Sequence, residues 1–380
     1  MNVSSDCLRW FQFRRSGLAK PFSTPESAAG ALSGIQAQIL SAAGIALWNR
    51  SRKLTWRGCE TRLFSKRSLV KLWGQRGTLH LYPSNDWPLI HGALSGRGTW
   101  QERLLERRGG DIAAWREKVR QVAEILRSRQ TIGRRGLRET GLELDEYDLS
   151  SWGGIFADLV RLGEACHAGS EGNEGLFASR AAWLPNLVWN PPTREEANVE
   201  ILRRYLAAYG PSRLRDFAYW RGVSVGEART WLERFEPGTV VPITLSEEPD
   251  GEPLLALYND VEDVMKPVPK RGEWPVRLLG RFDPLLLACR DKKPLINSAF
   301  YHRVWKKAGH IEATVLMDGR IAGTWRYRRE VSGLVVEVFP FVPFRPAICA
   351  AISERAIGIA AFFGLPFGRI DFKNGEDPGS

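Results

Sequence analysis

The pattern of apolar residues changes near residue 237, and this change constrains the fold of the 380-residue chain more than any other feature. Before residue 237, apolar residues recur mostly with the period of an amphipathic helix. After it, short segments rich in Val, Leu, Ile and Phe are typical of strands; they are 239–245, 254–259, 276–282, 312–319, 320–329 and 334–342. An apolar helix over 345–364 follows them. The chain is therefore predicted to be an α+β protein with a β-rich C-terminal region and a terminal helix.

The helical part divides into three units that resemble helix-turn-helix folds with a β-wing. Residues 1–105 predict helices over 5–17, from Pro25 to near Gly34, over 41–49 and up to Gly74, followed by a strand over 76–83. Residues 106–192 predict helices over 113–127 and 150–162 and a wing strand over 176–180. Residues 193–237 predict two helices separated by Gly-Val-Ser, which is the spacing of a helix-turn-helix. Tandem winged-helix units are therefore expected, with residues 238–380 as the β-rich region.

The charge indicates a nucleic-acid partner. The formal net charge is +11, the isoelectric point is about 9.6 and Arg outnumbers Lys. Arginine binds phosphates through a planar pair of donors and stacks on bases, although a GC-rich genome also raises arginine content. Five scattered cysteines predict free thiols in a reducing compartment, and we expect a cytoplasmic monomer that associates with the nucleoid when bound to DNA. No membrane span, metal or organic cofactor is expected, because long apolar runs, clustered ligands and phosphate-binding loops are not found.

The tripeptide Gln36-Ala37-Gln38 is an unusual feature of the first unit. It lies in a small, apolar stretch between two predicted helices, where a buried segment has no need of two amides. On a helix, residues two apart point in nearly opposite directions, whereas on an extended segment they share a face. If the segment is extended, both amides emerge together while Ile35, Ala37 and Ile39 anchor the other side. A pair of structural hydrogen bonds between helices is the alternative.

Four stretches resemble the AlkZ/YcaQ-like winged-helix DNA glycosylases: 34–50 around the Gln-Ala-Gln motif, 69–89, 280–287 and 316–326. The resemblance covers roughly residues 5–365. It implies tandem winged helices around a DNA-binding cleft, and hydrolysis of the N-glycosidic bond of alkylated purines, mostly N7-alkylguanine, with bulky adducts or interstrand crosslinks as substrates of some members. It also implies that Gln36 and Gln38 are the catalytic pair. Some members have aspartate where this chain has Gln38.

Glutamine suits this reaction although it cannot act as a base. An N7-alkylated purine is already cationic and leaves readily, so the enzyme needs mainly to position water beside C1′. An amide oxygen can accept a hydrogen bond from that water while its dipole faces the developing positive charge. No lysine lies near the motif in the sequence, which predicts a monofunctional enzyme without a lyase step. The expected substrate is double-stranded DNA with alkylated bases.

Further candidate DNA-binding residues lie on the predicted strands. Arg76, Thr78 and His80 are expected to line the cleft, although a structural role in a wing strand remains open. Asp283 could orient an arginine or shape the turn before Pro284. Four arginines on the predicted hairpin are expected to enter or flank a DNA groove: Arg320, Arg326, Arg328 and Arg329.

Two other functions remain open at this stage. One is a non-catalytic winged-helix DNA-binding protein, either a regulator or a sequestering resistance factor. The other is an interaction scaffold whose charge is only compositional. The Gln-Ala-Gln tripeptide favours the glycosylase, since a regulator has no use for it.

Overall fold

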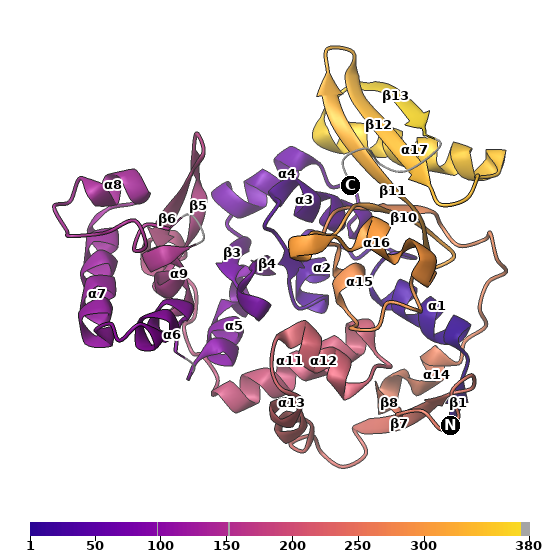
Figure 1. Ribbon diagram of the computed structural model, residues 1–380, viewed down its shortest axis with the longest axis horizontal. Helices are drawn as coiled ribbons and strands as arrows, with labels where there is room; N and C mark the ends of the chain where they lie inside the picture. The colour runs from indigo at the N-terminus through magenta and orange to yellow at the C-terminus, as the bar shows by residue number, and fades with distance from the viewer. Residues whose placement is uncertain (97, 151–152, 374–380) are drawn as a thin grey trace. The chain divides into compact units, whose positions relative to one another are not determined.

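The computed structural model describes residues 1–96, 98–150 and 153–373. The chain forms two compact units (Figure 1). Unit 1 consists of Met1–Cys59 and Val199–Ser380, and unit 2 consists of Glu60–Asn198. The division into segments 1–105, 106–192, 193–237 and 238–380 is finer than this and stays a prediction. The α+β class is confirmed, with the long strands in the C-terminal region as expected.

Unit 1 begins with short helices whose starts are set by local sequence. At the start of α2 (Pro25–Ala31), Thr24 accepts a hydrogen bond from the backbone of Ser27, and Ser27 accepts one from Thr24, which is a capping box followed by proline. The Ser224–Glu227 pair starts α13 (Val225–Leu232) in the same way. The remaining helices that lie wholly or mostly in this unit are α1 (Ser5–Arg15), α3 (Leu40–Arg50), α4 (Trp56–Glu60), α11 (Arg194–Tyr209), α12 (Leu214–Arg221), α14 (Val261–Val264), α15 (Pro284–Leu287), α16 (Tyr301–Val304) and α17 (Pro346–Phe363).

The main sheet of unit 1 has five strands in the order β13-β12-β11-β10-β9. They are β9 (Arg277–Leu279), β10 (Thr314–Met317), β11 (Arg320–Glu330), β12 (Gly333–Pro340) and β13 (Phe367–Phe372). The pairs are antiparallel except β12–β13, which is parallel and is joined by α17 as a crossover. The predicted turn between β10 and β11 is present, with Asp318 and Gly319 both at positive φ.

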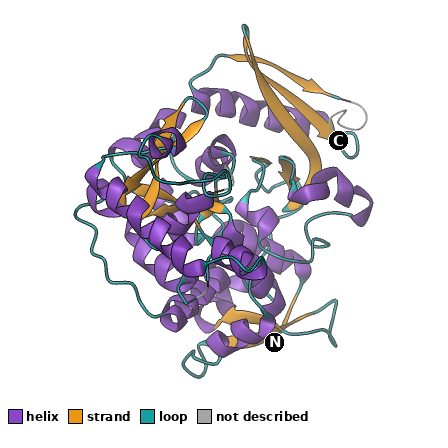
Figure 2. Ribbon diagram, turned by 60° about the vertical axis from the view of Figure 1, so that its left-hand side comes forward, coloured by secondary structure: helices purple, strands orange, loops and turns teal. Residues whose placement is uncertain are grey.

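Helix α17 packs against the main sheet, where it contacts β13, β9 and β12 (Figure 2). It is the one helix of the described residues that is long and apolar enough to cross a membrane by length and composition. In this fold its Phe362 ring contacts Trp48 and Trp56, and Arg355 donates to Asn49 and lies over the Trp48 ring. The helix is therefore packed against α3 and its surroundings.

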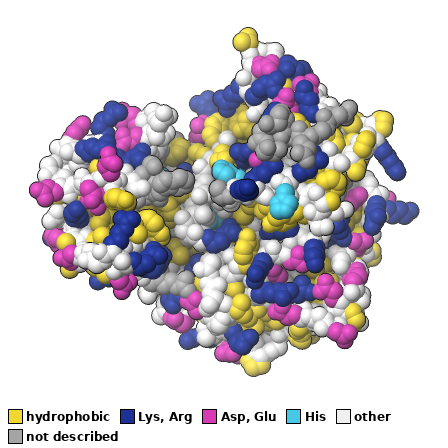
Figure 3. All heavy atoms as spheres, viewed as in Figure 1, with side chains coloured by type: hydrophobic (Ala, Val, Ile, Leu, Met, Phe, Trp, Pro, Cys, Tyr) yellow, Lys and Arg dark blue, Asp and Glu magenta, His cyan; other side chains and the backbone are white. Residues whose placement is uncertain are grey.

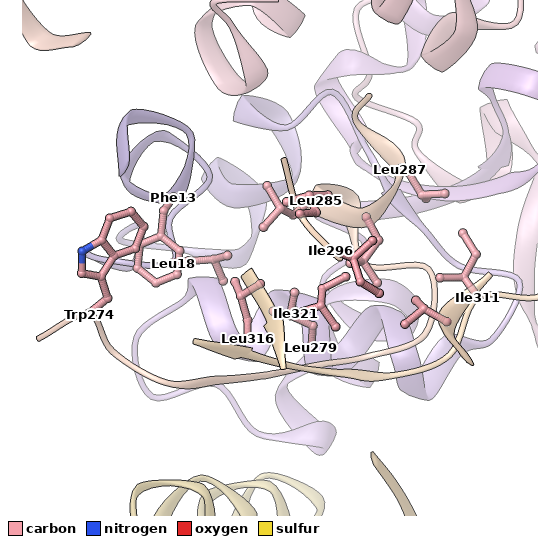
Figure 4. Packing of buried hydrophobic residues seen from close by; sticks show 13 residues of the cluster. Phe13, Leu18, Trp274, Leu279, Leu285, Leu287, Ile296, Ile311, Leu316 and Ile321 are labelled. Atoms are coloured by element: carbon pink, nitrogen blue, oxygen red, sulfur yellow. The ribbon is translucent and has the colours of Figure 1, made fainter. Parts of the chain in front are cut away.

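A single apolar cluster explains why the two ends of the chain fold into one unit. Phe13 and Leu18 near α1 pack with Trp274, Leu279 of β9 and Leu285 of α15 (Figure 4). The cluster continues through buried residues of the C-terminal region: Leu286, Leu287, Leu295, Ile296, Val304, Ile311, Leu316 and Ile321. A smaller sheet, β1-β7-β8, joins the N-terminus to the same unit through β1 (Asn2–Val3), β7 (Val240–Leu245) and β8 (Leu254–Leu257).

Unit 2 contains two β-hairpins and a group of helices. The strands are β3 (Leu69–Trp73), β4 (Leu79–Pro83), β5 (Ala165–Glu171) and β6 (Glu174–Ser179), and the helices are α5 (Trp87–Leu94), α6 (Trp100–Arg107), α7 (Ile112–Ser128), α8 (Arg134–Arg138), α9 (Gly154–Arg161) and α10 (Arg180–Trp183). The predicted helix over 113–127 is α7, and the predicted wing strand over 176–180 is β6. The predicted helix over 150–162 is present as α9, although its residues 151–152 lie outside the described residues.

One predicted element is wrong. The segment up to Gly74 was expected to be helical, but Leu69–Trp73 forms strand β3, antiparallel to β4, with Leu72 opposite His80. A short apolar run fits a buried helix or a strand equally well, and the hydrogen-bonding partner decides between them. Strand β13 was not predicted.

Candidate active site

The segment that carries the two glutamines is held extended by the turn before it. After α2, Ser33 and Gly34 both have positive φ, and the N–H of Gly34 donates to the carbonyl of Ala29. At φ +104° the Gly34 backbone is in a conformation that residues with a side chain rarely adopt. Buried Tyr209 of α11 donates to the carbonyl of Leu32 at 3.1 Å and anchors the same turn. The chain then leaves the turn as β2 (Ile35–Gln36).

The two amides lie on the same face, as the extended interpretation requires. The Nε2 of Gln36 donates to the Oε1 of Gln38 at 2.7 Å. Ile35 and Ala37 are fully buried and anchor the opposite face. Gln36 is also buried, whereas Gln38 is exposed. The arrangement therefore presents one amide to solvent with a second amide behind it.

Helix α3 follows the motif directly and is fixed by a buried ion pair at its other end. Arg50 donates two hydrogen bonds to the carboxylate of Asp283, at 2.8 and 2.7 Å, and neither side chain has exposed surface. Asp283 also accepts from the N–H of Leu285 and so caps α15. Both alternatives for Asp283, orienting an arginine and shaping the turn, are therefore present together. The sequence reasoning missed Arg50, because only the fold brings residues 50 and 283 together.

Arg76, Thr78 and His80 all lie in the β3–β4 hairpin of unit 2. Arg76 is in the left-handed region in the 3₁₀ turn Gln75–Gly77. The Oγ1 of Thr78 donates to the carbonyl of Gln75 at 3.1 Å, and Nδ1 of His80 lies 2.9 Å from the carbonyl of Thr78. Because a carbonyl oxygen can only accept, this contact requires a proton on Nδ1. His80 is buried and its ring lies against Tyr82, so these residues contribute to the structure of the hairpin.

The four arginines of the C-terminal region fall into two places in the fold. Arg320 follows the β10–β11 turn and donates to the carbonyl of Lys293. The other three lie near the far end of β11, where Arg326 and Arg328 share one face and both bind Glu337, at 2.7 and 2.9 Å. Arg329 lies over the Phe363 ring of α17. Sequence reasoning missed Glu337, although a single carboxylate in the otherwise apolar run 334–341 is its signal.

The lowered pKa of Glu337 is consistent with its ion pairs. The hydrogen bond from Arg326, opposed by burial and helped by Arg328, lowers the pKa of Glu337 below its usual value. The carboxylate therefore stays ionised and holds both guanidinium groups on the sheet.

Within residues 1–96, 98–150 and 153–373, no three His, Cys, Asp or Glu side chains lie close enough to hold a metal ion. The five cysteines are free thiols, as predicted.

Comparison with known proteins places this geometry in a family. Residues 29–362 match the family of AlkZ-like DNA glycosylases. The interstrand DNA cross-link repair glycosylase of Streptomyces sahachiroi is 27% identical over 347 residues, which are 88% of this chain and 90% of that protein. The solved structure of the S. sahachiroi DNA glycosylase AlkZ has the same fold, with a TM-score of 0.81 at 24% identity over 99% of this chain and all of that one. The chain belongs to the AlkZ-like family of DNA glycosylases.

Proposed function

We propose that the chain hydrolyses the N-glycosidic bond of cationic N7-alkylated purines in double-stranded DNA, with Gln38 as the catalytic residue and Gln36 as a positioning residue. The observation that carries this proposal is the 2.7 Å hydrogen bond from buried Gln36 to exposed Gln38. It supports different tasks for the two glutamines, which the sequence alone does not distinguish.

The proposed chemistry depends on the ability of the Gln38 side-chain oxygen to accept two hydrogen bonds at once. A carbonyl oxygen has two lone pairs. One accepts from Nε2 of Gln36, which fixes the orientation of the amide, and the other is available to hold a water beside C1′ of the damaged nucleotide. The negative end of the amide dipole then faces the positive charge that develops on the sugar as the bond breaks. The cationic purine leaves without protonation, so no general acid is needed.

The proposed substrate range includes interstrand crosslinks formed through N7 of guanine. The Streptomyces sahachiroi relative is named an interstrand DNA cross-link repair glycosylase. The same glycosidic bond is broken in such a crosslink, and cleavage on one strand is enough to release the strands from each other.

The test uses a duplex with a single N7-methylguanine, and it measures abasic sites under single-turnover conditions. Gln38→Ala is expected to lower the rate about 100- to 1,000-fold, as loss of one well-placed polar group in a transition state does. Gln38→Asp retains an oxygen acceptor and is expected to stay active. Affinity for the lesion duplex should change little in either variant, because contacts to phosphate supply most of it.

The role of Gln36 is tested by a double variant. Gln36→Ala should lower the rate less than Gln38→Ala does, and adding it to Gln38→Ala should cause no further loss, because Gln36 acts through Gln38. If the rate loss of the double variant were instead the product of the losses in the two single variants, both amides would contact the reacting groups. An inactive parent chain that still binds DNA would support the non-catalytic alternative, and borohydride trapping of a protein–DNA adduct would contradict the monofunctional assignment.

A further inference from the structure

A cavity of about 310 Å³ lies in unit 1 next to the Gln-Ala-Gln segment. Ile39, which directly follows Gln38, is part of its wall, as is Ser41 in the first turn of α3. Pockets for small ligands span about 300–1,000 Å³, so this cavity, at the lower end of that range, has room for a small ring system. Its position next to Gln38 makes it part of the surroundings of any lesion on which that residue acts.

The cavity has an aromatic wall on β11. Trp325 and Tyr327 are two residues apart on the strand, so their side chains share a face, and their rings are stacked with centroids 6.0 Å apart. The indole N–H of Trp325 donates to the carbonyl of Leu279 at 2.9 Å, and the Tyr327 ring contacts Phe363 of α17. Both rings are therefore held in place. Trp325 is buried, so the half-buried ring of Tyr327 is the flat surface that an occupant of the cavity would meet, and a ring held in this way loses little entropy on binding.

Another side of the cavity is formed by Ala42 of α3 and by Gly280 in the loop after β9. Gly280 lies so close to α3 that a Cβ there would be 2.9 Å from the carbonyl oxygen of Ala42. Such close contact keeps α3 and the loop at a fixed separation, so the cavity is a built part of the unit.

The charges around the cavity favour an uncharged occupant. Two arginines contribute to its lining, and each is paired with a glutamate: Arg281 with Glu312 at 2.6 Å, and Arg326 with Glu337 at 2.7 Å. A phosphate would have to compete with these carboxylates, and a purine cation would meet two guanidinium groups at close range. An uncharged aromatic group meets neither cost.

We propose that this cavity receives the flat, uncharged substituent that a bulky adduct carries on N7 of the purine, while Gln38 acts at the sugar. This inference rests on the proposed function and specifies which part of a large lesion the chain recognises. It predicts that the cavity affects the choice among lesions more than the chemistry of bond cleavage.

The experiment compares two duplexes, one with N7-methylguanine and one with N7-benzylguanine, in single-turnover excision. Ser41→Leu places a larger side chain in the cavity while retaining a good helix former, and Ser41→Ala is the control that leaves the cavity open. We expect Ser41→Leu to lower the benzyl-to-methyl rate ratio by about tenfold or more, which is the range for small volume changes in apolar pockets. Ser41→Ala should keep the parent ratio.

Tyr327 provides an independent test in case Ser41→Leu fails to fold. Tyr327→Leu removes the flat face and should lower the same ratio, whereas Tyr327→Phe should retain it. Equal losses on both duplexes, or an unchanged ratio in Ser41→Leu and Tyr327→Leu, would overturn the proposal. Failure of the proposed function is seen separately, in a parent chain that excises neither base, and the inference would fall with it.

Discussion

Arg50 and Asp283 show how a single residue pair can hold the Gln-Ala-Gln segment in place. Arg50 is the last residue of α3, and it also donates to the carbonyl of Ser16 at 2.8 Å and to that of Ala46 at 3.1 Å. Arg50 therefore connects the end of α1, helix α3 and, through Asp283, helix α15. Because the Gln-Ala-Gln segment leads directly into α3, displacement of this helix would also displace Gln38.

At the residue scale, loss of the Asp283 carboxylate should destabilise the chain strongly. Asp283→Asn leaves the charge of Arg50 buried and uncompensated, which typically costs about 3–5 kcal/mol in the free energy of unfolding. The urea midpoint should fall accordingly. The double variant Arg50→Met with Asp283→Leu should recover part of the loss, because no buried charge remains. A parental midpoint in Asp283→Asn would show that the pair has little effect on stability.

At the scale of elements, Asp158 joins three helices of unit 2. This buried residue of α9 accepts hydrogen bonds from Thr99, the cap of α6, at 2.6 Å and from the indole of Trp115 in α7 at 2.7 Å. Burial raises the pKa of Asp158 to about 6, against the lowering effect of these two hydrogen bonds. The folded chain therefore binds a proton at Asp158 more tightly than the unfolded chain does.

The raised pKa predicts a pH dependence of stability. Between about pH 4 and about pH 6 the native state holds more protons at this group than the unfolded state, so its contribution to stability falls as pH rises through that window. Asp158→Asn keeps an oxygen acceptor and removes the titration. The difference in melting temperature, variant minus parent, should therefore be larger at about pH 7.5 than at about pH 4.5. The corresponding change in the difference in free energy of unfolding is at most about 3 kcal/mol.

The control for this prediction is Asp250→Asn, which changes an exposed loop carboxylate. Its melting temperature relative to the parent should vary little between the two pH values. The raised pKa of Asp158 would be contradicted if the melting temperature of Asp158→Asn differed from that of the parent by the same amount at both pH values.

At the scale of the whole molecule, the positive charge is distributed among many ion pairs. Lys and Arg side chains lie among Asp and Glu over the visible surface of each unit (Figure 3). In unit 1, Arg213 pairs with Glu248 and Arg215 with Glu252. The formal net charge of +11 is therefore the excess that remains after extensive pairing. Such an excess attracts DNA through many phosphate contacts and little through sequence.

This charge predicts that binding to undamaged duplex DNA depends steeply on salt. A chain with about six phosphate contacts should lose about 1,000-fold in affinity between about 50 and about 200 mM salt. Fluorescence anisotropy over that range gives the slope of log affinity against log salt. Gln38→Ala should have the parental slope, because the amide is uncharged. A flat dependence would mean that the positive charge is not used for DNA binding.

Local sequence was enough to predict the features that depend on neighbouring residues. Thr24-Pro25 starts a helix, and Asp318-Gly319 makes a tight hairpin turn, because the groups involved lie within a few residues of one another. The shared face of Gln36 and Gln38 belongs to this class. It follows from an extended backbone, which was one of two alternatives for this segment, whereas the catalytic assignment of the pair rests on the resemblance to the AlkZ/YcaQ-like glycosylases.

Contacts between distant segments decided the rest. Residues 69–73 form a strand because β4 provides the hydrogen-bonding partner, and β13 pairs with β12 in the main sheet because α17 carries the chain back to the start of a parallel strand. The Arg50–Asp283 pair spans 233 residues, and the aromatic cavity beside Gln38 combines α3 with β11. Backbone preference within a short window carries no information about which remote segment will provide a partner. The motif could therefore be recognised from the sequence, whereas the different exposure of its two glutamines and the cavity next to them come only from tertiary packing.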